Sequence, residues 1–141
     1  MMRLLAPRVL AYFGLCASVC GIAMLYLFDP ASSALFPSCP FFSITGLHCP
    51  GCGTLRALHR LLHFRFIEAF AMNPLTLACL PFVTYGIGSA FMDAVFARPF
   101  WRIEWRPLWS WGVLLIVVGF GVLRNISIAP FQLLAPGGLL Q

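Results

Sequence analysis

Long apolar segments alternate with short polar ones along this chain. Residues 9–28 contain no charged side chain, and as a helix rising about 1.5 Å per residue they span about 30 Å, the thickness of a bilayer's hydrocarbon core. Residues 74–92 form a second uncharged run, and 108–123 form a shorter third one. The pattern predicts an all-α integral membrane protein with three transmembrane helices. The first run exceeds the apolar core of about 7–15 residues typical of a signal peptide, which makes cleavage the weaker interpretation.

The segment between the first two apolar runs is of a different kind. Residues 35–53 show neither helical nor strand periodicity, and their prolines and glycines predict an irregular loop. Irregular backbone exposed to lipid would leave amide groups unpaired, so we expect this loop at the membrane interface or against protein. The chain is predicted to form a single membrane domain, 1–141, in which 35–73 comprises this loop and the helix that follows it.

An amphipathic helix is predicted over residues 54–72. At 100° per residue its basic side chains share one stripe about 100° wide, formed by Arg56, His59, Arg60 and His63. Such a helix lies at a membrane surface with its stripe towards lipid phosphates. Asn73 and Pro74 then favour the cap and first residue of a new helix.

Composition and charge narrow the class of protein. Hydrophobic residues make up 61% of the 141 residues and charged residues 9%, against about 25% charged in soluble domains. The net charge of +5 comes from scattered arginines, which suits lipid phosphates and argues against nucleic acid as a partner. In the connector 93–107, Arg98, Arg102 and Arg106 stand among aromatic residues, a mixture typical of a membrane-surface anchor. We therefore predict a multi-pass cell-membrane protein whose partners are the lipid bilayer and other membrane proteins, with its orientation open.

The cysteines divide into two groups. Three lie inside apolar runs, where a thiol packs as a small hydrophobe: Cys16, Cys20 and Cys79. The other three lie among proline, glycine, serine and threonine, and are the candidates for chemistry: Cys39, Cys49 and Cys52.

Zinc binding is the first hypothesis for the second group. Cys49-Pro50-Gly51-Cys52-Gly53 resembles a zinc knuckle, in which a tight turn brings two thiolates to one tetrahedral ion. Cys39 and one histidine would complete the site. His59 is our first candidate for this ligand, and His48 and His63 stay open as alternatives.

Two further hypotheses use the same thiols. Cys49 and Cys52 form a C-x-x-C pair at a helix start, where the helix dipole and Arg56 favour a thiolate, as thiol-disulfide exchange requires. Alternatively, a structural disulfide fastens the loop, and Arg56 and Arg60 bind a phosphate or lipid head group. In all three cases Gly51 and Gly53 shape the turn. Whether the protein is an enzyme is left open by these residues.

The cysteine segment resembles a family of small bacterial membrane proteins known as DUF2752. The resemblance rests on an ordered motif: Cys39-Pro40, Thr45-Gly46, Cys49-Pro50-Gly51-Cys52-Gly53, Arg56-Ala57-Leu58-His59, Leu61-Leu62-His63 and Asn73-Pro74-Leu75. Leu55 replaces a hydroxyl residue of the family pattern, and Phe64-Arg65 replaces a turn containing glycine. The resemblance implies a multi-pass protein of the bacterial inner membrane with a cysteine loop, and it implies no activity. We therefore expect a zinc knuckle or disulfide in a binding or scaffold subunit, with a membrane thiol-disulfide oxidoreductase as the alternative.

Overall fold

The computed structural model describes residues 2–33, 35–37, 39–96 and 107–138, with side chains from residue 9 onward. These residues form helices and no strands, which confirms the all-helical prediction for the part described. The order is α1 (Met2–Leu27), α2 (Pro40–Thr45), α3 (Thr54–Leu62), α4 (Phe66–Met72), α5 (Pro74–Phe96), α6 (Pro107–Leu123) and the 3-10 helix η1 (Phe131–Leu134). The predicted anchor residues Arg98, Arg102 and Arg106 lie outside the described residues.

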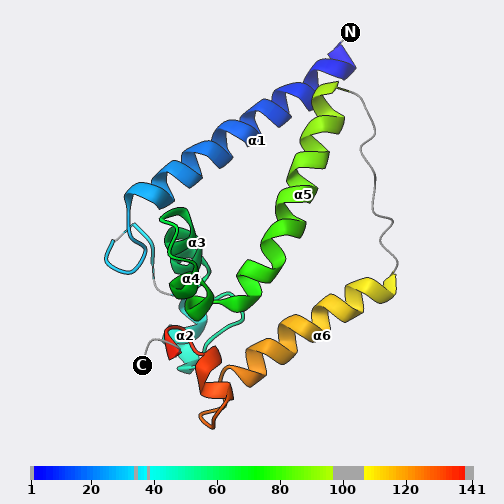
Figure 1. The fold of residues 1–141 in the computed structure, drawn as a ribbon. Coiled ribbons are helices and arrows are strands. Elements are labelled where there is room, and N and C mark those ends of the chain that lie inside the picture. Colours follow the sequence, from blue (N-terminus) through cyan, green and yellow to red (C-terminus); the bar gives the residue numbers. More distant parts are fainter. Residues whose placement is uncertain (1, 34, 38, 97–106, 139–141) are drawn as a thin grey trace.

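The three long apolar helices form an open frame. α1 and α5 meet near the start of α1 (Figure 1), where the rings of Tyr12 and Phe91 make an edge contact with centroids 6.3 Å apart. The two helices diverge towards the other end. The last residues of α6 lie near that end, and the rest of α6 extends away from it as a separate arm. By length and composition Val9–Leu27 and Pro74–Phe96 are able to cross a membrane, and Pro107–Leu123 is a shorter apolar helix.

A compact unit of short helices fills the wide end of the frame. α3 and α4 pack against each other between the end of α1 and the start of α5 (Figure 1). The buried residues of this pair are alanines: Ala57 on α3, and Ala69 and Ala71 on α4. Small side chains at these positions let the two helix backbones approach closely.

The predicted helix 54–72 is interrupted at residues 63–65. Phe64 adopts the left-handed conformation, with φ of 59°. The amide of Arg65 donates to the Arg60 carbonyl at 2.9 Å and that of Phe64 to the Leu61 carbonyl at 3.0 Å. These two bonds form the Schellman motif that ends helices, usually with glycine in the left-handed position. The prediction of one continuous helix was wrong because a phenylalanine occupies that position here.

The predicted irregular loop 35–53 also contains a short helix, α2. Cys39 precedes it, Pro40 is its first residue, and Gly46 follows its end with φ of 70°. Proline at the first position and a left-handed glycine after the last are common helix boundaries. The loop was predicted without this helix because six residues are too few to show a helical period.

Candidate metal centre

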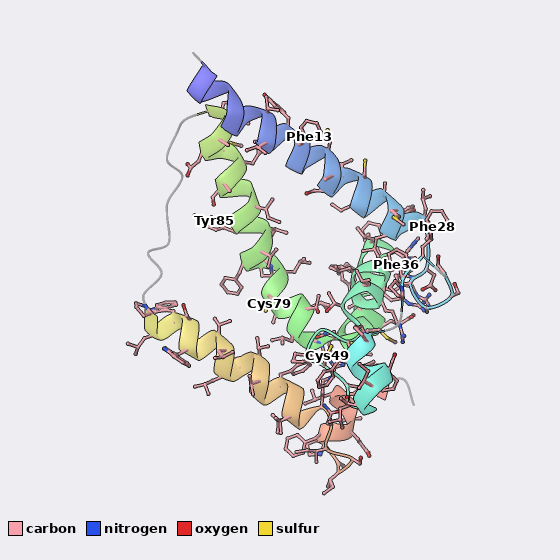
Figure 2. The ribbon with its side chains drawn as sticks, turned by 180° about the vertical axis from the view of Figure 1, so that it is seen from behind. Phe13, Phe28, Phe36, Cys49, Cys79 and Tyr85 are labelled. Atoms are coloured by element: carbon pink, nitrogen blue, oxygen red, sulfur yellow. The ribbon has the colours of Figure 1, made fainter. Side chains whose placement is uncertain are left out.

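Three cysteine sulfurs gather where α2, α3 and α5 come together. The Sγ of Cys49 lies 3.1 Å from that of Cys52 and 3.5 Å from that of Cys39. All three sulfurs lie within 4.8 Å of one another, and the cysteines are free thiols. Figure 2 shows Cys49 near the start of α5, whereas Cys79 lies farther along that helix. The structure thus brings together the three cysteines that the sequence singled out.

The cysteine turn, residues 49–53, places two of these sulfurs before α3. The amide of Cys52 donates to the Cys49 carbonyl at 3.0 Å, and that of Thr54 to the Gly51 carbonyl at 3.1 Å. Gly53 has φ of +85°, and a Cβ there would lie 2.7 Å from the carbonyl oxygen of Met72. Glycine is therefore required at this position both for the backbone angle and for the close approach of α4.

Asn73 holds the cysteine turn from the side of α5. It is fully buried. Its Nδ2 donates to the carbonyls of Pro50 and Cys52 at 3.0 and 3.2 Å, and to the Thr54 hydroxyl at 3.3 Å. Its Oδ1 accepts the Thr76 amide at 3.1 Å, the bond of a helix N-cap. One side chain thus starts α5 and fixes the backbone that carries the cysteines.

Arg124 holds the same turn from the end of α6. Its Nη1 donates to the carbonyls of Cys49 and Pro50 at 3.0 and 3.2 Å, and its guanidinium lies 5.0 Å from the ring centre of Phe120. The residue is only 1% exposed, and its Nε and Nη2 have no hydrogen-bond partner among the described residues. A buried guanidinium with unsatisfied donors is costly unless negative charge lies nearby.

Asn125, the next residue, fastens the chain just before the turn. Its Oδ1 accepts the His48 amide at 2.7 Å, and its Nδ2 donates to the His48 carbonyl at 2.8 Å. The His48 ring stacks on Phe42 with centroids 4.7 Å apart. Burial, followed by the charges of Arg124 and Arg56, lowers the pKa of His48, so its imidazole is neutral at physiological pH.

The thiols differ in how readily they ionise. The Phe42 amide, followed by the Cys49 thiol, lowers the pKa of Cys39 through hydrogen bonds to its sulfur. Burial, followed by the hydrogen bonds that its S–H donates to the neighbouring sulfurs of Cys49 and Cys39, raises the pKa of Cys52 to about 12. Cys39 therefore forms a thiolate more easily, whereas Cys52 keeps its proton until a metal ion displaces it.

Residues 39–87 match the family model described as Protein of unknown function (DUF2752). The predicted resemblance is confirmed over this segment. Comparison with curated proteins and with solved structures found no match. The DUF2752 segment contains the three cysteines and Asn73, whereas Arg124 and Asn125 lie beyond it and reach the turn only through the fold.

The histidines predicted as further ligands lie elsewhere. The Nδ1 of His59 lies 2.7 Å from the Leu25 carbonyl oxygen, and the Nε2 of His63 lies 3.0 Å from that of Tyr26. Both rings therefore face the end of α1, and neither joins the group of close sulfurs. Among the described residues that group contains Cys39, Cys49 and Cys52 alone.

The two arginines predicted to bind an anion have different surroundings. Arg60 pairs with Glu68 at 3.2 Å and lies 3.9 Å from Asp29. Arg56 lines a cavity that also touches Cys39 and Cys52. The structure therefore brings Arg56, and not Arg60, to the cysteine site.

Sequence reasoning missed Arg124 and Asn125 as parts of the site. They directly follow an apolar run, where an arginine is usually assigned to the membrane surface. The sequence offered one indication of their role. A long basic side chain stands next to an asparagine, whose side-chain amide can bond to both the N–H and the C=O of a backbone. Nothing in their spacing indicates contact with a turn about 75 residues earlier in the chain.

Proposed function

We propose that this chain is a multi-pass membrane protein that holds one Zn²⁺ through the thiolates of Cys39, Cys49 and Cys52, and that it serves as a binding or scaffold subunit. The observation that carries the proposal is the group of three sulfurs within 4.8 Å of one another. Thiolates are soft ligands that favour zinc over magnesium or calcium.

The sulfur distances suit a tetrahedral ion after small adjustments. Zinc–sulfur bonds of about 2.3 Å in tetrahedral geometry separate the sulfurs by about 3.8 Å. The observed separations of 3.1 and 3.5 Å are slightly shorter. They are well above the roughly 2.05 Å of a disulfide bond. Small rotations about the Cα–Cβ bonds would therefore admit the ion while the clamped backbone stays in place.

The buried charge of Arg124 supports the same proposal. Zn²⁺ with three thiolates carries a net charge of −1, which would offset the guanidinium held against the Cys49 carbonyl. Groups that contact the ligands of a metal, rather than the metal itself, orient those ligands and tune the site. No carboxylate pairs with Arg124 in the described part of the chain, where Asp29 and Glu68 pair with Arg60.

A membrane location is supported by the surface of the long helices. Large apolar side chains are exposed along α1, α5 and α6, among them Phe13, Phe82 and Leu115, each more than 70% exposed. Acyl chains would cover these surfaces. We place the protein in a cell membrane, and the resemblance to bacterial proteins favours the bacterial inner membrane, with the lipid bilayer and other membrane proteins as partners.

Elemental analysis of protein purified in detergent without chelator or reductant tests the metal. We expect about one zinc per chain and three thiols that alkylate only after a chelator is added. Cys49→Ser should abolish zinc retention, whereas Cys79→Ser, an exposed thiol on α5, should leave it unchanged. Protein without metal in which two loop thiols are oxidised would contradict the zinc proposal and indicate a disulfide.

A membrane thiol-disulfide oxidoreductase is the second candidate. It is favoured by the position of Cys49, whose sulfur contacts those of both Cys52 and Cys39. The three thiols would then include a pair that exchanges with an external disulfide. Metal-free protein whose Cys49–Cys52 pair equilibrates reversibly with a glutathione buffer would support this candidate over zinc binding.

A further inference from the structure

A cavity of about 640 Å³ lies beside the three-cysteine site. It is bounded by the link that follows α1, by the start of α3 and by Pro136 of the tail. Figure 2 shows Phe36, one of its lining residues, between the end of α1 and α3. Its lining residues include four with polar or charged side chains: Cys39, Cys52, His48 and Arg56.

The fourth coordination position of a metal held by the cysteines would face this cavity. Cys39 and Cys52 both line it, whereas Cys49 does not. Within the described residues, no further cysteine, histidine or carboxylate places a ligand atom in the group of close sulfurs. Structural zinc sites are closed by four protein ligands, whereas sites that bind ligands or substrates keep a position open. The cysteine site belongs to the open kind.

Arg56 is the cation available in the cavity. Its guanidinium makes no hydrogen bond or ion pair with any residue in the described ranges, in contrast to Arg60, Arg65 and Arg124. No carboxylate is found among the described residues that line the cavity. A free guanidinium presents a fork of donors that matches phosphate or carboxylate oxygens.

We propose that the cavity binds a phosphate group, with one oxygen on the fourth position of the metal and two others on Arg56. This inference rests on the zinc site proposed above. A carboxylate has two oxygens, so binding the metal through one would leave a single oxygen for the arginine. Phosphate keeps enough oxygens to bind the metal and the guanidinium fork together.

Charge and shape agree with this ligand. A singly charged phosphate group on the trithiolate zinc brings the net charge to −2, which Arg56 and Arg124 balance. The cavity far exceeds the size of the anion, and its remaining walls include apolar residues: Pro30, Phe36, Phe42 and Leu55. The same chemistry is offered by free phosphate, by a soluble phosphate ester and by a phospholipid head group.

Cobalt substitution of the full-length chain in detergent tests the proposal. Co²⁺ bound by three thiolates shows sulfur-to-cobalt charge-transfer bands, and its visible d–d bands report the fourth ligand. Titration with inorganic phosphate should shift the d–d bands to saturation. Arg56→Gln should weaken this response at least about tenfold, the loss expected for a charge-assisted pair, in protein loaded to the same cobalt content. Arg60→Gln is the matched control and should have no effect.

Nanodiscs distinguish a lipid from a soluble source. Without free phosphate, the shift should appear in discs containing phosphatidic acid and be absent in phosphatidylcholine discs if the head group is the ligand. A shift with inorganic phosphate alone would assign the site to soluble phosphate. Either result supports phosphate binding.

The possible negative results of the cobalt experiment differ in which proposal they overturn. Charge-transfer bands with d–d bands that respond to neither phosphate source would overturn phosphate binding and leave the metal site standing. A change in the d–d bands of His48→Gln in phosphate-free buffer would show that His48 is the fourth ligand, and would also overturn it. Absence of the charge-transfer bands would overturn both proposals.

Discussion

The two ends of α3 each carry side chains that bind metals in many proteins, but their surroundings differ. Before its first turn the sulfurs of Cys49 and Cys52 contact other sulfurs, and the backbone carbonyls of that turn accept bonds from Asn73 and Arg124. At its last turn the ring nitrogens of the histidines face backbone carbonyls instead. In the first region the sulfurs remain able to bind a metal. In the second region the histidine nitrogens are already hydrogen-bonded to the backbone.

The second region, the histidine cap formed by His59 and His63, completes the end of α1. A helix leaves its last four carbonyls without partners in its own ladder. The carbonyls of Leu25 and Tyr26 are two of these, and each receives a histidine nitrogen. Because a carbonyl oxygen only accepts, both nitrogens carry hydrogen and donate. Residue type therefore does not identify a metal ligand; its ligand atom must also lie close to other ligand atoms rather than against a backbone carbonyl.

Substitution of Asn73 should produce the largest loss in the cysteine region. Asn73→Ala removes the two Nδ2 hydrogens that serve two carbonyls of the cysteine turn and the Thr54 hydroxyl, and it removes the cap of α5. At about 1 kcal/mol for each donated bond, zinc affinity should fall about 100-fold. Competition with a chromophoric chelator measures this change.

Asn73→Ser separates the two roles of this residue. Serine also caps helices, but its shorter side chain does not reach the carbonyls of Pro50 and Cys52. We expect α5 to start normally in this variant while zinc affinity stays low. Wild-type zinc affinity in Asn73→Ala would show that the backbone clamp is unnecessary for the site.

Removal of the buried charge should have the next largest effect. Arg124→Met keeps the side-chain length and removes a guanidinium that has two unsatisfied nitrogens. Zinc affinity should fall about 10- to 100-fold, as for other outer groups of metal sites. The metal-free protein should be no less stable, because an unpaired buried cation is lost.

Chemical unfolding with and without zinc measures both quantities for Arg124→Met. Arg124→Lys keeps the positive charge but lacks the planar guanidinium. It should therefore bind zinc more tightly than Arg124→Met and less tightly than the wild type. Equal destabilisation of the zinc-bound and metal-free forms would mean that Arg124 acts only through its hydrogen bonds to the turn.

A smaller effect should follow from the contact between α6 and the turn. A Cβ at Gly121 would lie 2.8 Å from Cγ of Pro50, whereas one at Gly119 would meet nothing within 4 Å. Gly121→Ala should therefore push α6 from the turn and lower zinc affinity about fivefold, since overpacking costs about 1 kcal/mol. Gly119→Ala is the matched control on the same helix. Equal affinities in the two variants would show that this contact does not support the site.

The sequence predicted the helices of the frame better than their contacts. Long uncharged runs fold as helices whatever surrounds them, so helical structure in 9–28, 74–92 and 108–123 followed from the pattern. The break at Phe64 did not, because bulky residues such as phenylalanine rarely adopt the left-handed angle that ends the helix here. Local patterns thus predict where helices form better than where the chain turns.

The candidate site was predictable only as far as it is local. Cys49 and Cys52 share one turn, so their sulfurs were expected to be close, and Cys39 was expected nearby from its polar surroundings. The contribution of Arg124 depends on how α6 packs against that turn, which neither periodicity nor spacing encodes. The position of His59 was not predictable for a similar reason: its Nδ1 lies against the end of α1, which is far away in sequence.

The histidine cap should respond to substitution without affecting the metal. His59→Phe keeps an aromatic ring against His63, whose ring centre lies 4.6 Å away, and removes the donor to the Leu25 carbonyl. Leaving that half-buried carbonyl without a partner should cost about 1 kcal/mol. Zinc content should be unchanged, because the ring nitrogen belongs to the end of α1. Elemental analysis measures the zinc, and hydrogen exchange in the last turn of α1 measures the loosening.

His63→Phe is the matched control for this prediction. His63 donates to the Tyr26 carbonyl at 3.0 Å at an exposed position, where water can replace the lost bond, so the change in exchange should be smaller than for His59→Phe. Loss of zinc in His59→Phe with normal exchange in α1 would return His59 to the ligand set. It would show that the two ends of α3 are not separate, because a histidine of the last turn would then serve the metal instead of the end of α1.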